Sequence, residues 1–314
     1  MDLRREDFKR TAHAPAKLNL FLELLGRRDD GFHELETVVV PIRLVDSLSF
    51  RSTESNKSGF PGDIRLQVQS SPPLRSRVAG QPIPTGPDNL VVRALKLLQE
   101  RSGCELGADV ELVKRIPAAA GLGGGSSDAA AALKLANRAW QLDWGSDRLA
   151  ALAAEIGSDI PFFFAEGPAI CRGRGEQIEK LPAIRPLHFV VVAPPDGLNT
   201  AEVYRAYAAN QANTTDIVPP EHGLLEFISG LTHGCGFAVL SQMRNALQKT
   251  ASSLSAWVEK TTMAFHQLDF IGHQLSGSGS AYFGVCRHAQ HARRLANILR
   301  MRQLGTVYAT SSCP

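Results

Sequence analysis

Apolar and polar residues alternate along much of the first half of the chain, which is the pattern of β-strands. In residues 14–26 leucines recur at every second position and mostly polar residues fill the positions between them, so we expect a half-buried strand. One face holds Leu18, Leu20, Leu22 and Leu24, and the other holds Lys17, Asn19, Phe21 and Glu23. Residues 33–50, 63–69 and 108–117 predict further strands, and the loop-like composition of residues 51–62 and 71–88 predicts loops.

A helical period replaces the alternation in three places. Residues 90–103 predict a helix that Asp88 or Asn89 caps and that Gly103 ends. An alanine run from residue 129 predicts a second helix, and residues 146–156 predict a third. The second helix carries one apolar stripe, made of Ala129, Leu133, Ala136 and Trp140.

The second half of the chain also mixes strands and helices. Residues 169–182 and 187–195 predict strands, 200–270 is rich in helical pattern around a polar loop at 210–223, and 289–302 predicts a closing helix. Residues 273–286 predict a strand, a glycine turn and a strand, although "SGSGS" alone has the composition of a flexible linker. An α+β protein with a domain boundary near residue 165 is the expected architecture.

Composition limits the classes of partner. The 314 residues carry a net charge of +3 and no long basic run, which argues against nucleic acid. Five scattered cysteines without a C-x-x-C pair indicate a reducing compartment rather than a disulfide framework or a zinc site. No apolar run approaches the roughly 18 residues of a membrane span, and residues 1–13 lack the apolar core of a secretory signal. We expect a short disordered leader and a cytoplasmic protein.

The sequence "IPAAAGLGGGSSDAAAAL" (116–133) places a glycine-rich segment between a predicted strand and a predicted helix. Such a segment presents backbone N–H groups and the positive end of a helix dipole, which together form an anion site. Ser126 and Ser127 can cap the helix or donate hydroxyl groups to a phosphate. No Gly-Lys-Ser/Thr follows, and Ser126 stands where G-x-G-x-x-G needs its third glycine. Phosphate binding and a tight strand-to-helix turn both remain open on these grounds.

The pattern P-x-x-x-G-L-G-G-G-S-S-D-A-A (117–130) resembles the central motif of the GHMP kinases. "PAKLNLFL" (15–22) and "LSGSGSAYFGV" (275–285) resemble that family's first and third motifs, in the family's order, and the similarity spans nearly the whole chain. The resemblance implies a two-domain α+β fold with the active site between the domains. The N-terminal ATP-binding domain would cover 1–165 and the C-terminal substrate-binding domain 166–314.

Within the family, the strings at 16–39, 123–130 and 157–163 are similar to one branch of kinases. That branch phosphorylates the 2-hydroxyl of cytidine diphosphate methylerythritol in the nonmevalonate pathway to isoprenoid precursors. The resemblance implies ATP and Mg²⁺ as cofactors, with no metal ligand that the sequence assigns. The ATP phosphates would be held by Pro117, Ala118, Ala119, Ala120, Gly121, Leu122, Gly123, Gly124, Gly125, Ser126 and Ser127.

The resemblance also assigns two catalytic residues. Asp159 in "GSDIPFF" would accept or orient the proton of the hydroxyl group, although by itself an Asp before Ile-Pro is more simply a helix or turn cap. Lys17 would neutralise charge on the transferred phosphoryl group, although a lysine on a strand is more often solvated. Both roles are implied only by the resemblance to the family.

Substrate recognition is assigned in the same way. Phe32 and His33 would stack on and hydrogen-bond the cytosine, with Phe32 standing where Tyr is common. Thr200 and Tyr204 match a short segment that supplies a threonine and a second aromatic ring, although a lone Tyr at helical spacing is often core. Asn19 shares the face of Lys17 and would orient the hydroxyl or a carboxylate, or else be a satisfied polar group of the sheet.

Two other functions remain open. A GHMP kinase for another alcohol would keep the glycine segment, Lys17 and Asp159 without needing the cytosine residues. A non-enzymatic regulatory protein on this fold would be free to lose Lys17 or Asp159, and both are present. We expect a small-molecule substrate and neither nucleic acid nor a membrane as partner. The sequence predicts no oligomeric state.

Overall fold

The computed structural model describes residues 10–55, 61–70, 77–78, 81–211, 223–233 and 236–313. The chain divides into two compact units, each built from segments that are not adjacent in the sequence. Unit 1 contains residues 1–15, 45–116 and 124–164, and unit 2 contains residues 16–44, 117–123 and 165–314. Residues 1–9 of the expected leader, and parts of the loops expected at 51–62, 71–88 and 210–223, lie outside the described residues.

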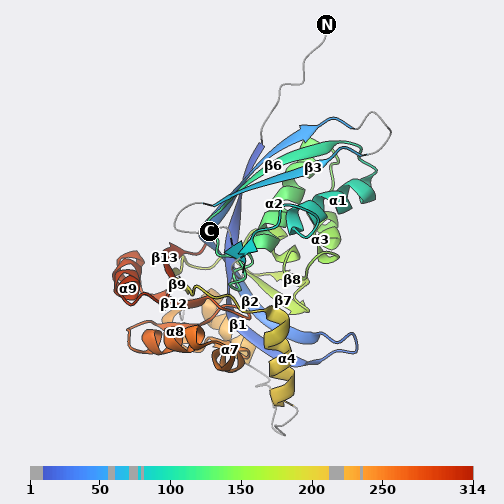
Figure 1. The fold of residues 1–314 in the computed structure, drawn as a ribbon. Helices are drawn as coiled ribbons and strands as arrows, with labels where there is room; N and C mark the ends of the chain where they lie inside the picture. Colours follow the sequence, from blue (N-terminus) through green and yellow to red (C-terminus); the bar gives the residue numbers. More distant parts are fainter. Residues whose placement is uncertain are drawn as a thin grey trace. The chain divides into compact units, whose positions relative to one another are not determined.

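Unit 1 places helices against strands that pair through β6 (Gly107–Lys114). Residues 47–53 of β2 (His33–Thr53) run antiparallel to β6, and β3 (Ile64–Ser70) runs parallel to it. Helix α1 (Leu90–Ser102) packs against both α2 (Gly124–Ala139) and β3 (Figure 1). The remaining elements are the short pair β4 (Arg77–Val78) and β5 (Gln81–Pro82), α3 (Ser146–Ala154) and the 3₁₀ helix η1 (Pro161–Phe164).

Unit 2 contains the strands at residues 33–44 of β2 and at residues 16–27 of β1 (Arg10–Arg27). β2 pairs antiparallel with β7 (Ala169–Gly173), which pairs with β8 (Gln177–Lys180), and β1 pairs with β10 (Arg244–Asn245). A separate antiparallel sheet has the order β11-β12-β9-β13. Its strands are Gly272–Leu275, Tyr282–Cys286, His188–Ala193 and Thr306–Ser311, respectively.

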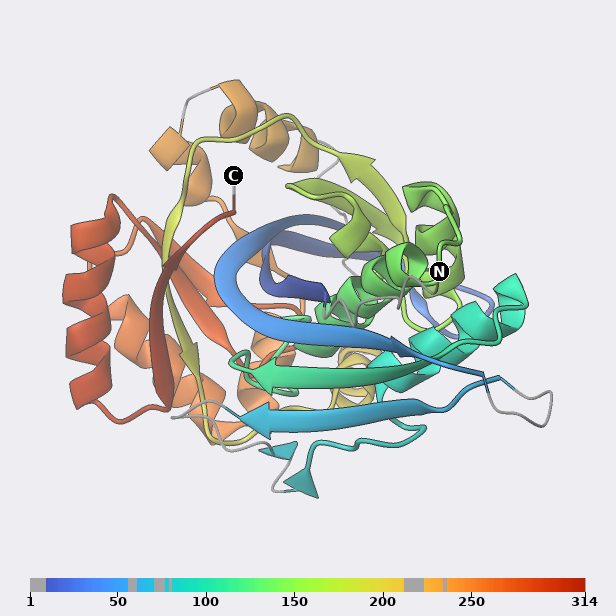
Figure 2. The ribbon, with the colours of Figure 1, turned by 90° about the horizontal axis from the view of Figure 1, so that it is seen from above.

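The helices of unit 2 supply the rest of its core. α8 (Ala256–His266) and α9 (Ala289–Met301) both pack on the β11-β12-β9-β13 sheet, as Figures 1 and 2 show. Phe265 of α8 lies against Tyr282 of β12 with ring centroids 5.0 Å apart, and both side chains are fully buried. The other helices are α4 (Thr200–Gln211), α5 (Gly223–His233), α6 (Gly236–Leu240) and α7 (Gln248–Leu254).

The α+β class and most of the predicted elements are confirmed. Asn89 caps α1 by accepting a hydrogen bond from the backbone N–H of Val91, and Gly103 ends the helix in the left-handed conformation with φ 67°. The stripe of α2 is buried as expected. In the described part of the chain no helix reaches the length and apolarity that crossing a membrane requires.

Four expectations were wrong. β1 is buried on both faces rather than half-buried, because neighbouring segments cover its polar face as well: Lys17 is 6% exposed and Asn19 5%. α2 begins at Gly124, so two glycines and two serines expected in a loop form its first turn. β13 was not predicted at all. Residues 10–13, expected to belong to a disordered leader, are part of β1, which begins at Arg10.

Candidate active site

The glycine-rich segment has an unusual backbone. Every second residue has a positive φ: 52° at Ala119, 74° at Gly121 and 68° at Gly123. Positive φ at alternate positions is a feature of the backbone concavities that bind anions. The backbone of this segment therefore suits an anion-binding role.

The carbonyl groups of the same segment accept hydrogen bonds from other residues of unit 2. Ala120 O accepts from the N–H of Ala281 at 3.0 Å, and Leu122 O accepts from the N–H of Lys17 at 2.9 Å. Gly121 O accepts from the hydroxyl of Ser276 at 3.0 Å. Since the carbonyls are fixed on one side, the segment keeps its shape without help from a ligand.

The "SGSGS" turn (276–280) packs directly on this segment. A Cβ at Gly121 would lie 2.1 Å from the carbonyl oxygen of Ser276, so only glycine fits there. Ser276, Ser278 and Ser280 are buried, which excludes the flexible-linker interpretation. Asn245 also holds the turn, because its side-chain N–H groups donate to the carbonyls of Leu275 and Gly277 at 2.9 and 2.8 Å. The third motif and the glycine-rich segment thus form one folded structure.

Lys17 and Asn19 project from β1 toward the same turn. Lys17 Nζ donates to Asn19 Oδ1 at 2.6 Å, and a Cβ at Gly277 would lie 3.2 Å from that ammonium nitrogen. Asn19 Nδ2 donates to Thr37 Oγ1 at 2.9 Å, and the Thr37 hydroxyl donates to the carbonyl of Phe21 at 2.6 Å. Gln274 adds a bond from its Nε2 to the carbonyl of Asn19 at 2.7 Å. The chain of hydrogen bonds fixes the position of Asn19 and Lys17.

Thr200 belongs to the same surroundings, because its hydroxyl lies 2.9 Å from the hydroxyl of Ser278 in the turn. The structure therefore brings Lys17, Asn19, Thr200 and the segment 117–123 together through residues 276–280. Sequence reasoning missed Thr37, Asn245 and Gln274. Thr37 follows His33 and Leu35 at period two on β2, which is the one signal that could have indicated it.

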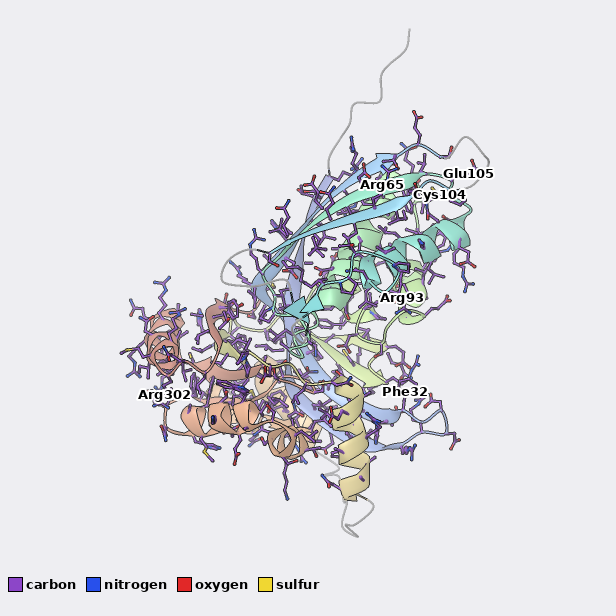
Figure 3. The ribbon with its side chains drawn as sticks, viewed as in Figure 1. Phe32, Arg65, Arg93, Cys104, Glu105 and Arg302 are labelled. Carbon is purple, nitrogen blue, oxygen red and sulfur yellow. The ribbon has the colours of Figure 1, made fainter. Side chains whose placement is uncertain are left out.

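Aromatic side chains form a second group in unit 2. The His33 ring lies 5.4 Å from the Tyr204 ring and 6.0 Å from the Tyr207 ring, measured between centroids. Burial, and secondarily the charge of Arg27, lower the pKa of His33, which favours the neutral imidazole with one donor and one acceptor nitrogen. Phe32 is adjacent and 54% exposed, and Figure 3 marks its position near the β1–β2 turn. Tyr207, three residues after Tyr204, was missed by the sequence analysis.

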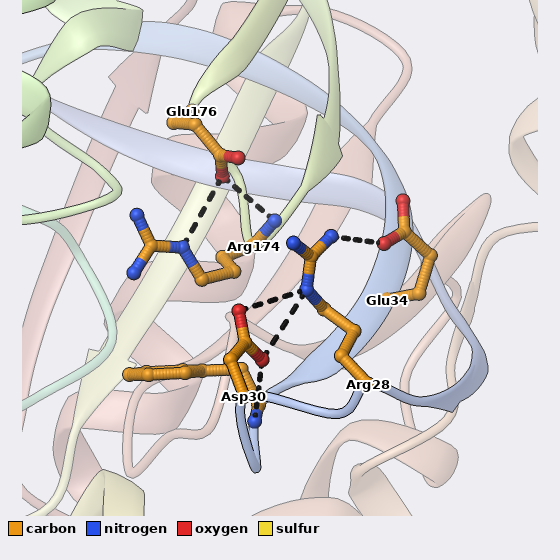
Figure 4. Close-up of polar contacts among 6 residues, drawn as sticks. Arg28, Asp30, Glu34, Arg174 and Glu176 are labelled. Carbon is orange, nitrogen blue, oxygen red and sulfur yellow. Dashed lines mark hydrogen bonds and ion pairs between the residues drawn. The ribbon is translucent and has the colours of Figure 1, made fainter.

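The turn that carries Phe32 is stiffened by a group of charged residues, shown in Figure 4. Asp30 Oδ1 accepts from the N–H of Phe32 at 3.1 Å. The guanidinium of Arg174 lies 5.1 Å from the Phe32 ring centroid. Arg28 donates to Asp30 at 3.1 Å and to Glu34 at 2.5 Å, and Arg174 pairs with Glu176 at 3.8 Å. We call Arg28, Asp30, Glu34, Arg174 and Glu176 the hairpin cluster.

Asp159 belongs to unit 1, in the turn that precedes η1. The N–H of Ile160 donates to the carbonyl of Gly157 at 3.2 Å, and Ile160 itself is fully buried. The neighbouring side chains of η1, from Pro161 to Phe164, are also buried. Asp159 is exposed on this anchored turn.

Unit 1 contains a further group of charged residues that the sequence analysis did not single out. Lys114 Nζ donates to Asp128 Oδ2 at 2.7 Å and to Asp46 Oδ2. All three side chains are buried, with Asp46 at 0% exposure and Asp128 at 2%. Asp128 directly follows the two serines of the glycine motif, and that position was the available signal. We call Asp46, Lys114 and Asp128 the buried cluster.

Burial shifts the pKa values of the buried cluster. Burial raises the pKa of Asp128 to about 7, against the attraction of Lys114 and with the repulsion of Asp46 adding to it. Burial acts to lower the pKa of Lys114, but the two carboxylates outweigh it and raise that pKa. Asp46 accepts three hydrogen bonds, from Lys114 and from the backbone N–H groups of Arg115 and Ile116, and Asp128 accepts one from Lys114.

The described residues contain no group of three or more His, Cys, Asp or Glu side chains that could hold a metal ion. A nucleotide-bound Mg²⁺ does not require such a group, because it usually keeps several waters and binds through phosphate oxygens.

Comparison with known proteins gives consistent matches. Residues 89–167 match the model of the GHMP kinases N terminal domain. The chain is 37% identical over 286 residues to the 4-diphosphocytidyl-2-C-methyl-D-erythritol kinase of Pelotomaculum thermopropionicum, covering 91% of this chain and 92% of that protein. It is 38% identical over 310 residues to the enzyme of the same name from Rhodopirellula baltica, covering 91% and 89%.

Solved structures agree in fold. A crystal structure of 4-(cytidine 5'-diphospho)-2C-methyl-D-erythritol kinase matches with a TM-score of 0.75 and 32% identity, covering 97% of this chain and all of that one. Homoserine kinase from Cytophaga hutchinsonii matches with a TM-score of 0.72 at 16% identity, covering 100% and 96%, which shows the shared fold alone.

Proposed function

We propose a specific phosphoryl transfer for this chain, which belongs to the GHMP kinases and, within them, to the 4-diphosphocytidyl-2-C-methyl-D-erythritol kinase family. The chain is an ATP-dependent small-molecule kinase. In the proposed reaction the γ-phosphoryl group passes from ATP to the 2-hydroxyl of 4-diphosphocytidyl-2-C-methyl-D-erythritol, an isoprenoid precursor. The observation that carries the proposal is the 37% identity over 91% of the chain to a kinase of that name.

Residues Pro117 to Ser127 are proposed to hold the ATP phosphates. The backbone N–H groups of this segment and the start of α2 would supply hydrogen bonds and a positive dipole end. The absence of a Cβ at Gly121 keeps the segment close to the serine turn. Mg²⁺ is proposed to enter with the nucleotide, held by phosphate oxygens and water, and to supply charge neutralisation.

Asp159 is proposed to accept the proton of the 2-hydroxyl as the new O–P bond forms. Its place on the anchored turn before η1 supports a fixed orientation. Lys17 is proposed to stabilise the negative charge of the transferred phosphoryl group. The hydrogen bond from Lys17 Nζ to Asn19 supports a positioned ammonium group, and Asn19 is proposed to orient the substrate hydroxyl.

Phe32, His33, Thr200 and Tyr204 are proposed to bind the cytidine part of the substrate. A neutral His33 suits the hydrogen-bonding edge of cytosine, and the exposed Phe32 ring offers a stacking face. The grouping of His33 with Tyr204 and Tyr207 supports a pyrimidine site. The hydrogen bond of Thr200 to Ser278 supports placing Thr200 beside Asn19 and Lys17.

We also propose three properties of the whole protein. The first is a division into an ATP-binding domain (1–165) and a substrate-binding domain (166–314). A cytoplasmic location is another, and the free thiols of Cys104, Cys171, Cys286 and Cys313 in the described residues support it. The third is a partner set limited to small molecules.

The test is a phosphorylation assay with the purified protein, ATP and Mg²⁺. The cytidine diphosphate substrate, mevalonate and homoserine are supplied separately as acceptors. Transfer to the cytidine compound alone is the expected result. Transfer only to another alcohol would contradict the proposed substrate and the proposed pyrimidine site. The absence of transfer to any acceptor would contradict the proposed phosphoryl transfer itself.

A further inference from the structure

The glycine-rich segment is attached to unit 1 at both of its ends. The chain leaves unit 1 after Ile116 and re-enters it at Gly124, the first residue of α2. The distance between the end of β6 and the first turn of α2 therefore sets the span that residues 117–123 must bridge. Contacts that fix this distance also fix the shape of the segment.

The buried cluster makes those contacts on both sides. On the side before the segment, Asp46 Oδ1 accepts from the backbone N–H groups of Arg115 and of Ile116, the latter at 2.9 Å. On the side after the segment, Asp128 lies in the first turns of α2 and binds Lys114 at 2.7 Å. Lys114 joins the two carboxylates, since its ammonium group also donates to Asp46. The cluster is thus a continuous link from residues 115–116 to α2.

Packing fixes the same distance. A Cβ at Gly124 would lie 2.9 Å from Ile116 Cγ2 and 3.2 Å from Lys114 Nζ, so the start of α2 is in close contact with the end of β6. Each additional methyl group there would move one element away from the other.

The buried cluster is not an efficient source of core stability. A buried ion pair contributes little net stability compared with well-packed apolar residues of similar size. Two buried polar atoms next to it, Asp128 Oδ1 and Ser127 Oγ, have no hydrogen-bond partner within the described residues. A purely structural role does not require such a group, and a role in geometry explains its presence.

We propose that Asp46, Lys114 and Asp128 are positioning residues for the nucleotide, which hold the two ends of the glycine-rich segment at the separation that binds the ATP phosphates. This inference rests on the proposed function, in which residues 117–127 bind those phosphates. It assigns no contact between the cluster and the nucleotide. Its effect is on the shape of the binding segment, and therefore on affinity for ATP.

The test is the affinity of Lys114→Met for a nonhydrolysable ATP analogue with Mg²⁺, measured by calorimetry beside the melting temperature. We expect the Kd of the analogue to rise about tenfold. Gln99→Leu is the matched control, because Gln99 is also buried in unit 1 and donates hydrogen bonds to the carbonyls of Gly62 and Leu106. It should lower the melting temperature while leaving the Kd within twofold.

Asp128→Asn serves if Lys114→Met does not fold, because it keeps the shape of the side chain while changing its bond to Lys114. We expect its Kd to rise about threefold. If the folded cluster variants bind the analogue as wild type does, the cluster is only structural and the inference is overturned. If the wild-type protein does not bind the analogue at all, the proposed function fails, and the inference fails with it.

Discussion

The two groups of charged side chains show how differently one chain can use the same chemistry. The buried cluster in unit 1 places one ammonium between two carboxylates, all below 7% side-chain exposure. The hairpin cluster in unit 2 pairs two guanidinium groups with three carboxylates whose side chains are between 21% and 43% exposed. The shortest pair of the hairpin cluster, Arg28 with Glu34 at 2.5 Å, is as close as Lys114 and Asp128 at 2.7 Å, so a short distance alone does not distinguish the two groups.

The two clusters differ in their exposure to solvent. Water competes for every partner in the hairpin cluster, and such pairs contribute little to stability. In the buried cluster each group depends on the others, because removing one leaves a charge or a donor uncompensated in a dry interior. Burial therefore assigns the first cluster to stability and backbone geometry, and exposure leaves the second to orient Phe32.

The largest effect is expected from Asp46→Ala. The change leaves Lys114 with one carboxylate and leaves the N–H groups of Arg115 and Ile116 without their acceptor. Loss of one partner of a buried pair costs about 3–5 kcal/mol of unfolding free energy. Urea denaturation measures it. Asp109→Ala on β6, the strand that carries Lys114, is the control, because its pair with Arg51 is solvated, and its loss should cost at most about 1 kcal/mol. Equal losses in the two variants would remove the contrast between buried and surface charge.

Asp159→Ala tests whether an exposed carboxylate is essential for catalysis, although it contributes little to stability. We expect turnover to fall by about 100-fold or more, because the hydroxyl proton loses its acceptor. ATP-analogue affinity and the unfolding midpoint should remain those of wild type, because the side chain is exposed. Turnover and binding are measured on the same preparation. Near-wild-type turnover would remove Asp159 from the mechanism.

The buried cluster also predicts a dependence of stability on pH. The pKa of Asp128 is raised to about 7 in the folded protein, whereas an ordinary Asp has 3.8. The folded state therefore binds the Asp128 proton more tightly than the unfolded state does, and this difference adds to the free energy of unfolding. The contribution is complete below pH 3.8 and is lost as pH rises to about 7. Unfolding free energies of wild type and Asp128→Asn across this range test it. Their difference should shift steadily against wild type as pH rises, and a constant difference would show that Asp128 does not titrate there.

Phe32→Ala tests whether the β1–β2 turn contributes to binding of the cytidine substrate. Loss of the stacking ring should raise the KM for the cytidine substrate about 2- to 10-fold and leave the KM for ATP unchanged. Phe32→Tyr keeps the ring and should behave as wild type. If Phe32→Ala raised both KM values equally, the ring would have no specific role in holding cytosine.

The smallest effect is expected from Arg28→Ala. The guanidinium bonds only to the exposed side chains of Asp30 and Glu34, where water can replace it. The unfolding midpoint should not change measurably in a thermal melt. A clear drop in that midpoint would mean that the hairpin cluster contributes to the fold, contrary to the comparison above.

Much of the fold could be predicted from local pattern. Alternation predicted most of the strands, and Asn89 and Gly103 marked the ends of α1, because caps and periodicity are properties of neighbouring residues. β13 was missed although it is as long as β9, because Val307 is its one buried residue and no alternation of apolar and polar residues marks it. The composition of the glycine segment predicted either an anion site or a tight turn, and it did not predict that residues 124–127 form the first turn of α2.

The three ordered motifs indicated the GHMP kinase family, and the strings at 16–39, 123–130 and 157–163 indicated the branch and its reaction. What only the tertiary structure decided is which polar residues lie in dry surroundings and which partners they have. Lys17 was expected on a half-buried strand and is buried with Asn19 and Thr37. Asp46 is 68 residues from Lys114 in the sequence, and no local pattern connects them. Hydrophobic periodicity reports which face of an element is buried, whereas pairing across strands and helices depends on how distant segments pack.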